Sequence, residues 1–373
     1  MAAVRGVGEA PGRVNLIGEH TDYNGGFVLP FAIPQAAWLA AAPRADGRWR
    51  FLSLDLDSTV KSGEVVPGEH GWQAYLAGVV WALRQAGHQV GGADLVLSSS
   101  VLAGAGLSSS VAIKCVVMAA LCDLCGLDIK SMDRARPCQV AENSYVGAST
   151  GLMDQAASTL CTQGHALFLD CRSLEVAQMP LDVAAAGPEI LVVGTKTPPA
   201  NMDGKYAARR ALWVAACAEL GIGLLREVIG PAAALTRLPE FEGRHVRHVV
   251  TENARVQGTV AALSVGDFAE VGRLMTASHA SMRDDYEITA PNVDLAVETM
   301  LADAEAAAVA RAGYLAPAGF TARRRASATP SDTDKISKPE GELDHQQRGV
   351  TVPMSERGLF LSTETMRSAE SIP

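Results

Sequence analysis

The sequence predicts a mixed α/β protein with two domains. The chain has 373 residues, which is enough for two hydrophobic cores. Short strand-like segments alternate with helical periodicity through the first half, as is typical of a mixed α/β domain. The second half is more helical, and apolar periodicity ends at about Ser327. No internal repeat is visible.

The first half places short strands and helices on either side of one glycine-rich loop. Strands are expected at 94–97 and 165–170, and helices at 75–86 and 139–146. After the loop at 104–110, a helix keeps Ile113, Val117, Leu121 and Leu124 on one face and ends at Gly126, a suitable C-cap. Another half-buried strand is indicated where Trp49, Phe51 and Ser53 alternate with Arg48, Arg50 and Leu52.

The second half contains one expected strand and several helices. The strand at 189–193 precedes a helix that starts at Ala207 and ends before Gly221. Apolar spacing predicts another helix over 243–263, and Asp267 is suited to cap a further helix through Met275. Beyond Ser327 the chain is too polar to offset its ordering entropy, so we expect a disordered tail.

Composition excludes several classes of function. The net charge is −9, which argues against a nucleic-acid or anionic-membrane surface but not against a local phosphate site. The start of the chain has no apolar signal-peptide core, and prolines interrupt the apolar stretch 27–43, so no membrane span is expected. Cys122 and Cys125 fall inside a helical pattern and are interpreted as buried or half-buried thiols, with a redox or metal role as the alternative. A cytoplasmic protein is expected.

The strongest local signal is the loop formed by Gly104, Ala105, Gly106, Leu107, Ser108, Ser109 and Ser110. Two glycines allow the backbone to approach a ligand, and a helix begins directly after them. The free N–H groups and positive dipole end of that helix suit an anion such as phosphate. The alternative is a flexible turn with a serine N-cap.

Two further segments carry clustered polar groups. The stretch from Pro11 to Pro30 contains Arg13, Glu19, His20 and Asp22, a mixture of donors and acceptors that suits a sugar. The alternative is a polar turn at 24–26 between two strands. In the stretch 141–155, Glu142 and Asp154 could hold a metal ion or accept a proton, the alternative being two solvated acids.

Taken together, these segments resemble galactokinases, one branch of the GHMP superfamily of small-molecule kinases. The string APGRVNLIGEHTDYNGG is similar to the galactokinase signature, GAGLSSS to the superfamily's ATP loop and GLMDQ to the segment with the catalytic aspartate. The later strings GKYAARR, RHVVTENARV and LMTASHASMRDDYEI also resemble galactokinase segments. The similarity runs from about Ala10 to Met300 in the family's order.

The resemblance implies a reaction and roles for particular residues. ATP would phosphorylate the anomeric hydroxyl of α-D-galactose, with Asp154 as the base and Arg13 stabilising negative charge. Glu19, His20, Asp22 and Tyr206 match positions that bind the sugar. Mg²⁺ would be held by Ser110 and Glu142, and the adenine side of ATP would meet Trp72, for which a core position is the alternative.

The resemblance also implies the domain organisation. Residues 1–170 would form an N-terminal mixed α/β domain with the sugar signature and the ATP loop. Residues 171–326 would form a C-terminal ferredoxin-like domain, and residues 327–373 the disordered tail. Galactose and ATP would be the binding partners, with no nucleic acid or membrane, and a monomer is expected.

The chain departs from the family pattern in two informative places. Lys114 stands where galactokinases usually have glutamate, a change that helix propensity tolerates. A third, glycine-rich motif of the form M-T-G-x-G-F-G-G has no counterpart, as though a segment near Leu301 were missing. Loss of a strand and a pocket wall predicts reduced stability and low or absent catalysis.

Other functions compatible with this sequence remain as alternatives. Relatives exist that bind galactose and ATP as regulatory sensors without turnover, and the absent motif is compatible with such a role. A damaged product without function is a further alternative. Among enzymes, N-acetylgalactosamine or another sugar is the second choice of substrate.

Overall fold

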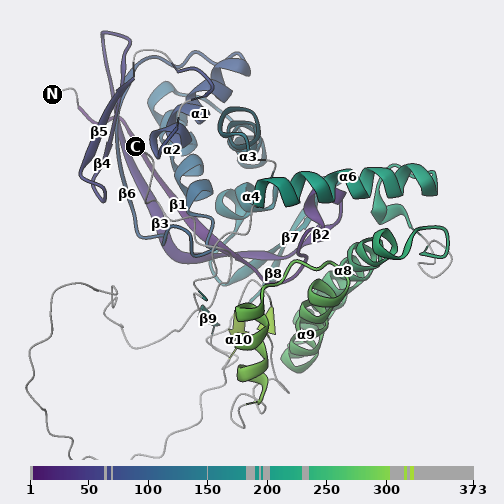
Figure 1. The fold of residues 1–373 in the computed structure, drawn as a ribbon. Helices are drawn as coiled ribbons and strands as arrows, with labels where there is room; N and C mark the ends of the chain where they lie inside the picture. The colour runs from purple at the N-terminus through teal and green to yellow at the C-terminus, as the bar shows by residue number, and fades with distance from the viewer. Residues whose placement is uncertain are drawn as a thin grey trace, which may run out of the picture.

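A computed structural model gives the fold of the chain (Figure 1). It describes residues 3–62, 65–68, 70–148, 150–181, 190–192, 195, 202–228, 235–302, 315–316 and 320–322. The expected disordered tail, 327–373, lies outside the described residues. The segment 303–314 lies outside them as well.

A mixed sheet of eight described strands organises the first half of the chain. The strand order is β2-β7-β3-β6-β4-β5, with β1 paired to β3 and β8 paired to β7. Most pairs are antiparallel, and β4 runs parallel to β6. The strands are β1 Gly6–Asn15, β2 Phe27–Val28, β3 Pro30–Pro43, β4 Trp49–Ser53, β5 Ser58–Ser62, β6 Ala93–Ser99, β7 His165–Asp170 and β8 Val176–Pro180.

The apolar stretch 27–43 supplies β2 and the long central strand β3. β3 pairs with β1, β6 and β7, which places it in the interior of the sheet, and α2 packs against it. The β1–β3 register shifts between Pro11 and Arg13, so Pro34 lies at an irregularity where no regular ladder bond is lost. Among the described residues, no helix is long and apolar enough to cross a membrane.

Four helices cover one face of this sheet (Figure 1). They are α1 Gln73–Gln85, α2 Ser109–Cys125, α3 Ser131–Val140 and α4 Met153–Leu160, and a π-helical turn, Ala141–Val146, follows α3. α2 packs directly on β1 and β3. The core between the layers contains fully buried Trp49, Phe51, Leu83 and Met118. This packing fixes the start of α2, and therefore the glycine-rich loop, against the end of β1.

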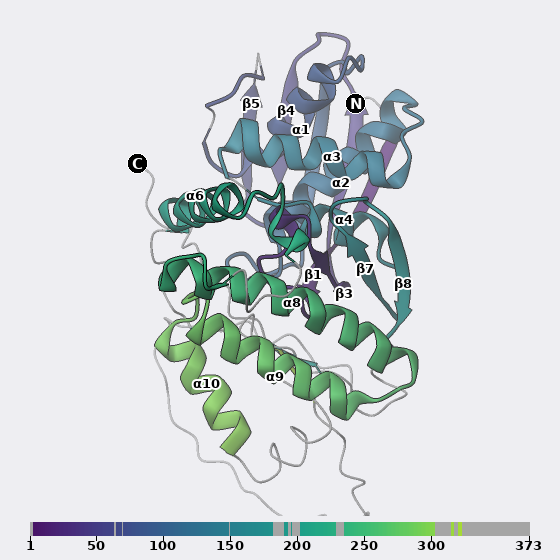
Figure 2. The same cartoon turned by 90° about the vertical axis from the view of Figure 1, so that its right-hand side faces the viewer.

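The second half is built around two long helices that lie side by side, α8 Glu240–Ser264 and α9 Phe268–Asp284 (Figure 2). The other elements are α6 Met202–Leu220, a 3-10 turn Leu225–Glu227, α10 Pro291–Ala302, β9 Ile190–Val192, β10 Leu315–Ala316 and β11 Phe320–Ala322. The last three form an antiparallel sheet in the order β10-β11-β9, against which α9 packs. α8 also contacts β2 and β8, and in this way it joins the two halves of the chain.

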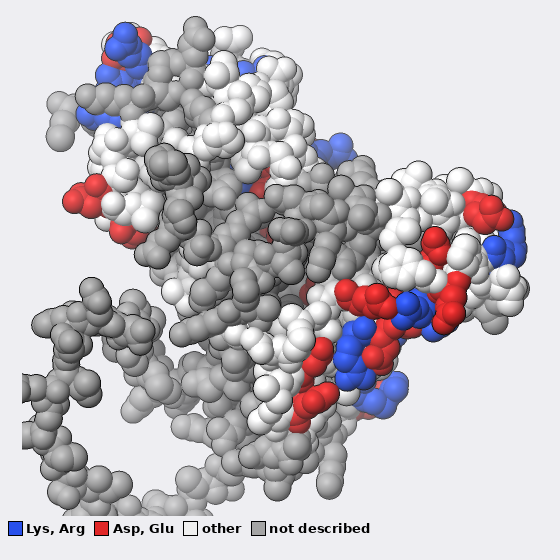
Figure 3. All heavy atoms as spheres, viewed as in Figure 1, with Lys and Arg blue, Asp and Glu red and all other residues white. Residues whose placement is uncertain are grey.

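Exposed charges of both signs lie along α8 and α9 (Figure 3). Arg244 pairs with Glu287 at 2.7 Å, and Arg247 pairs with Asp285 at 2.8 Å. These ion pairs connect α8 to the residues that follow α9. They are at least partly exposed, so each contributes little to stability.

The predicted strands and helices are mostly confirmed. The strands expected at 48–53, 94–97, 165–170 and 189–193 are β4, β6, β7 and β9, and Asp267 caps α9 by accepting from the Glu270 N–H at 3.0 Å. Three helix boundaries were wrong. The helix expected to start at residue 139 begins at Ser131 because α3 accommodates Pro137, α6 begins at Met202, and α9 continues past Met275 to Asp284. The first sheet extends through β8, beyond the domain boundary predicted at 170.

Candidate active site

Arg13 and Asp154 form a bidentate ion pair at the centre of the candidate site. Arg13 lies near the end of β1 and Asp154 in the first turn of α4, 141 residues apart in sequence. Arg13 Nε lies 2.6 Å from Asp154 Oδ1, and Nη2 lies 2.9 Å from Oδ2. Arg13 is 4% exposed, so this charge is held in one geometry with little competition from water.

The glycine-rich loop contacts this pair directly. Arg13 Nη1 donates to the Gly106 carbonyl at 2.7 Å, and the Ser108 hydroxyl donates to Asp154 Oδ2 at 2.7 Å. The backbone N–H of Arg13 also donates to the Leu107 carbonyl at 3.1 Å. The expected phosphate loop and the expected catalytic pair therefore share one hydrogen-bonded cluster.

The loop has an alternating backbone conformation that leads into α2. Gly104, Gly106 and Ser108 have positive φ values of 70°, 72° and 56°. Ala105 and Leu107 between them are buried. Ser108 makes no side-chain cap to α2, because its hydroxyl is used on Asp154, so the alternative of a simple serine N-cap is wrong. The N–H groups at the start of α2, at Ser109 and Ser110, remain suited to an anion.

Asp22, in the expected sugar-binding segment, lies close to the Arg13–Asp154 ion pair. Its carboxylate accepts hydrogen bonds from the backbone N–H groups of Tyr23 and Met153. Burial and the negative charge of Asp154 nevertheless raise the pKa of Asp22 to about 6. A Cβ at Gly151 would fall 1.7 Å from Asp22 Oδ2, so only glycine permits this close approach. The structure thus brings the signature loop and Asp154, the expected catalytic aspartate, together.

Glu19 and His20 occupy the same signature loop as Asp22. Glu19 Oε1 accepts from the Asn15 side chain at 3.0 Å. His20 Nδ1 lies 2.9 Å from the Tyr23 hydroxyl, and the His20 ring stacks on Tyr286 with centroids 5.0 Å apart. These contacts link the loop to the residues that follow α9.

Glu142 has a partner that the sequence did not suggest. It lies in the π-helical turn after α3, where its carboxylate Oε2 pairs with Lys114 Nζ. Lys114 is fully buried in α2, and its Nζ also lies 4.5 Å from the ring centroid of Tyr75. Lys114 therefore places a fixed positive charge on the expected metal ligand, and Glu142 is not the solvated acid of the alternative interpretation.

The remaining sequence candidates are placed less centrally. Trp72 is half-buried at the start of α1 and packs against the main core, which favours the core alternative without testing a contact with adenine. Tyr206 falls in α6, but its side chain lies outside the described residues. All seven cysteines lie in the part of the chain that the structure describes, and each is a free thiol.

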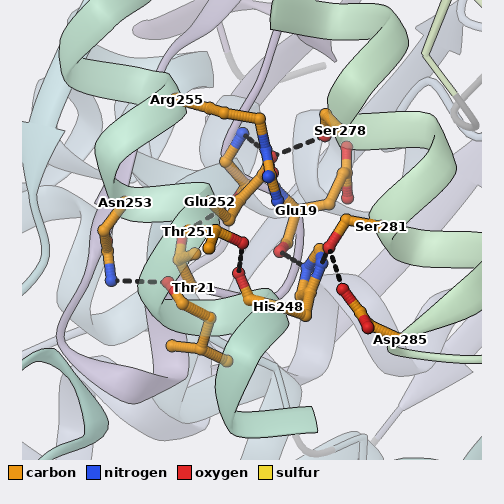
Figure 4. Close-up of polar contacts among 12 residues, drawn as sticks. Glu19, Thr21, His248, Thr251, Glu252, Asn253, Arg255, Ser278, Ser281 and Asp285 are labelled. Atoms are coloured by element: carbon orange, nitrogen blue, oxygen red, sulfur yellow. Dashed lines mark hydrogen bonds and ion pairs between the residues drawn. The ribbon is translucent and has the colours of Figure 1, made fainter. Parts of the chain in front are cut away.

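A buried polar network on α8, none of whose residues was predicted as functional, contacts the signature loop (Figure 4). Glu252 is fully buried and accepts from the Gly18 N–H at 3.0 Å, and His248 Nε2 lies 3.1 Å from the Glu19 carbonyl. One signal was available in the sequence. Glu252 follows Val249 by three residues and precedes Val256 by four, which places a charged side chain on the apolar face of the helix.

Comparisons with known proteins agree with this site. The chain matches the galactokinase galactose-binding signature over residues 2–43 and the GHMP kinase N-terminal domain over residues 74–162. It is 49% identical over 309 residues to a galactokinase of Streptomyces coelicolor, covering 81% of this chain and 80% of the relative. It is 42% identical over 294 residues to a galactokinase of Mycobacterium tuberculosis, covering 78% of this chain and 81% of the relative.

Solved structures show the same relationship. A galactokinase of Lactococcus lactis complexed with galactose superimposes with a TM-score of 0.75 at 31% identity, covering 80% of each chain. A mevalonate kinase of Methanococcus jannaschii superimposes with a TM-score of 0.57 at 14% identity, covering 86% of this chain and 90% of the other, which shows a shared fold.

Proposed function

This chain belongs to the galactokinases, which use ATP, and we propose that Arg13 and Asp154 are its catalytic residues for phosphorylating the anomeric hydroxyl of α-D-galactose. The observation that carries this assignment is the bidentate Arg13–Asp154 pair, which touches the phosphate loop at Gly106 and Ser108. In this proposal Asp154 supplies a base and Arg13 a cation beside the loop that would hold the phosphates, where a sugar hydroxyl and a phosphoryl group would meet.

Asp154 would orient the sugar hydroxyl and accept its proton. Its Oδ2 already accepts from Arg13 Nη2 and Ser108 Oγ, whereas Oδ1 accepts from Arg13 Nε. Oδ1 therefore has the greater remaining capacity to accept a hydrogen bond from the substrate. General-base catalysis of this kind typically contributes about 10²–10⁴-fold to the rate.

Arg13 would act on both reacting groups. Its Nε and Nη2 donate to the two carboxylate oxygens of Asp154, and its Nη1 donates to the Gly106 carbonyl of the proposed phosphate loop. A buried guanidinium in this position offsets the negative charge that moves onto the transferred phosphoryl group. The fixed geometry means that little reorganisation is needed during the reaction.

The sugar would be recognised by the signature loop. Glu19, His20 and Asp22 present carboxylate and imidazole groups that suit the several hydroxyls of galactose, and Tyr206 is proposed to contact the sugar from α6. Asp22 lies close enough to Asp154 for the two charges to interact, so the sugar site and the base are contiguous.

ATP would bind with its phosphates on residues 104–110. The positive-φ loop and the first turn of α2 supply backbone N–H donors, and the helix dipole favours negative charge there. Trp72 is proposed to lie on the adenine side.

Ser110 and Glu142 are proposed to hold Mg²⁺. A hydroxyl and a carboxylate fit Mg²⁺, which is commonly bound by one or two protein oxygens together with nucleotide phosphates. Lys114 engages Oε2 of Glu142, which leaves Oε1 as the carboxylate oxygen outside this ion pair. When bound, Mg²⁺ would neutralise part of the phosphate charge.

Product analysis tests the proposed function. The chain, galactose and MgATP are incubated, and the sugar product is identified by ³¹P NMR. We expect galactose 1-phosphate, with little product from N-acetylgalactosamine in a parallel reaction. Phosphorylation at another hydroxyl, or an equal rate with N-acetylgalactosamine, would contradict the assignment. Gel filtration and cell fractionation test the further expectation of a cytoplasmic monomer.

A further inference from the structure

Three neighbouring side chains of α8 hold the backbone of the sugar-signature loop (Figure 4). Glu252 Oε1 accepts from the N–H groups of Gly18 at 3.0 Å and Glu19 at 3.4 Å. His248 Nε2 lies 3.1 Å from the Glu19 carbonyl, and Asn253 Oδ1 accepts from the Phe27 N–H at 2.8 Å. α8 therefore binds the loop at its entry and at its exit.

The Glu252 carboxylate is buried and saturated with donors. Its residue is 0% exposed, and besides the two loop N–H groups it accepts from Ser278 Oγ at 2.7 Å and Arg255 Nε at 2.6 Å. Burial opposes its ionisation, but Arg255, His248 and the hydrogen bonds outweigh burial, and the pKa of Glu252 lies below its ordinary value. Such a group is costly to bury, and its partners on the loop account for its position.

His248 has a defined hydrogen-bonding state. Burial lowers its pKa, so the imidazole is neutral near pH 7 and carries one N–H. Nε2 faces a carbonyl oxygen, which can only accept, so that N–H lies on Nε2 and donates to Glu19. Nδ1 then lies 3.0 Å from the hydroxyl oxygen of Ser281, and this contact connects His248 to α9.

These contacts hold the loop next to a residue with a strained backbone conformation. His20, between Glu19 and Thr21, has a φ of 62°, a left-handed conformation that is strained for a non-glycine residue. Both backbone polar groups of the preceding residue, Glu19, are held from α8. Fixing that residue sets the direction of its own side chain and of His20.

We propose that Glu252, with His248 one helical turn before it, is a positioning residue that orients Glu19 and His20 for galactose binding. This inference rests on the proposed sugar-binding role of the signature loop. The loop belongs to the first half of the chain and α8 to the second, so the affinity for sugar depends on a helix that does not touch the sugar in this assignment. Substitutions on α8 should therefore change galactose binding with little effect on ATP.

Calorimetric titration with D-galactose, together with steady-state kinetics, tests this role. Glu252→Gln is expected to weaken galactose binding by at least about ten-fold while the KM for ATP stays within about two-fold of wild type. Glu270→Gln is the matched control, because Glu270 and Arg273 form the same three-residue-spaced ion pair on the exposed face of α9. A folded Glu252→Gln protein with galactose affinity within about two-fold of wild type would overturn the inference.

Two variants of His248 test the same positioning role even if Glu252→Gln does not fold. His248→Phe removes the donor to Glu19, whereas His248→Gln retains an N–H near the Nε2 position. We expect His248→Gln to bind galactose more tightly than His248→Phe. In hydrogen exchange, the segment 16–22 should exchange faster in His248→Phe but not in Glu270→Gln. Equal affinities for the two His248 variants, or unchanged exchange in this segment, would refute the role.

The same measurements separate this inference from the site assignment beneath it. Glu19→Gln and Asp22→Asn are titrated alongside. If they lose galactose affinity while the α8 variants do not, the positioning role is wrong and the sugar site stands. If wild type binds galactose and neither signature variant is weakened, the sugar-site assignment fails, and the inference fails with it.

Discussion

Asp22 carries an unfavourable charge, and replacing it with asparagine should stabilise the protein at neutral pH while weakening sugar binding. Burial and repulsion from Asp154 raise the pKa of Asp22 from 3.8 to about 6, although backbone hydrogen bonds and the positive charge of Arg13 lower it. The folded protein therefore takes up a proton that the unfolded chain has released. The contribution of protonated Asp22 to the free energy of unfolding is fully present below about pH 4 and is lost as the pH rises through about 6.

The size of this effect follows from the pKa difference. A rise from 3.8 to about 6 corresponds to an upper limit of about 3 kcal/mol above pH 7. Asp22 is only half-buried, so screening by water should reduce the penalty to about 1–2 kcal/mol. Asparagine keeps an oxygen for the N–H groups of Tyr23 and Met153 but removes the charge.

Urea unfolding at pH 7.5, 6.5 and 5.5 measures the effect. Asp22→Asn should be more stable than wild type at pH 7.5, and the difference should shrink as the pH falls. Asp123→Asn, which removes an exposed carboxylate on α2, is the control. Galactose affinity, measured by calorimetry, should fall in Asp22→Asn alone. A variant that is less stable than wild type at pH 7.5, or an advantage that does not shrink, would refute this reasoning.

Three further perturbations have defined outcomes. Arg13→Ala and Asp154→Ala should each lower kcat by at least about 10³-fold, and single-turnover assays that retain most of the rate would contradict the catalytic pair. Lys114→Met should destabilise the apo protein by about 3–5 kcal/mol, because Glu142 is left buried and unpaired. Mg²⁺ with ADP should then raise the Tm of the Lys114→Met variant more than it raises the Tm of wild type, and an equal rise would argue against Glu142 as a ligand. Without a third glycine-rich motif, turnover should be well below that of the Streptomyces coelicolor relative, and equal kcat values in parallel assays would exclude a need for that motif.

Local patterns predicted the elements whose apolar faces are regular. β4 alternates as expected, and α2 ends at Gly126, which has a left-handed φ of 64°. β3 was not predicted, because Pro34 interrupts it and because its more exposed face also carries apolar side chains such as Trp38, so the sequence shows no apolar/polar alternation. Its place in the sheet depends on pairing with β1, β6 and β7, and a short stretch of sequence around β3 does not show these partners.

In the candidate site too, some residues could be predicted from the sequence and others could not. Resemblance to galactokinases indicated Arg13 and Asp154, and the structure brings them within hydrogen-bonding distance from distant parts of the chain. Helix propensity could not show that Lys114 points into the core and meets Glu142. Glu252 was also not predicted, because the groups that its carboxylate binds, the N–H groups of Gly18 and Glu19, lie 234 and 233 residues away in the sequence.

Galactose-dependent release of ADP from MgATP by the purified chain is the most direct measurement of galactokinase activity. Continuous coupled detection with and without galactose, and with EDTA in place of Mg²⁺, separates phosphoryl transfer to sugar from background hydrolysis. We expect ADP release that requires both galactose and Mg²⁺, at a rate below that of the Streptomyces coelicolor relative. A folded protein that releases no ADP in response to galactose, or that releases it equally without sugar, would contradict the assignment.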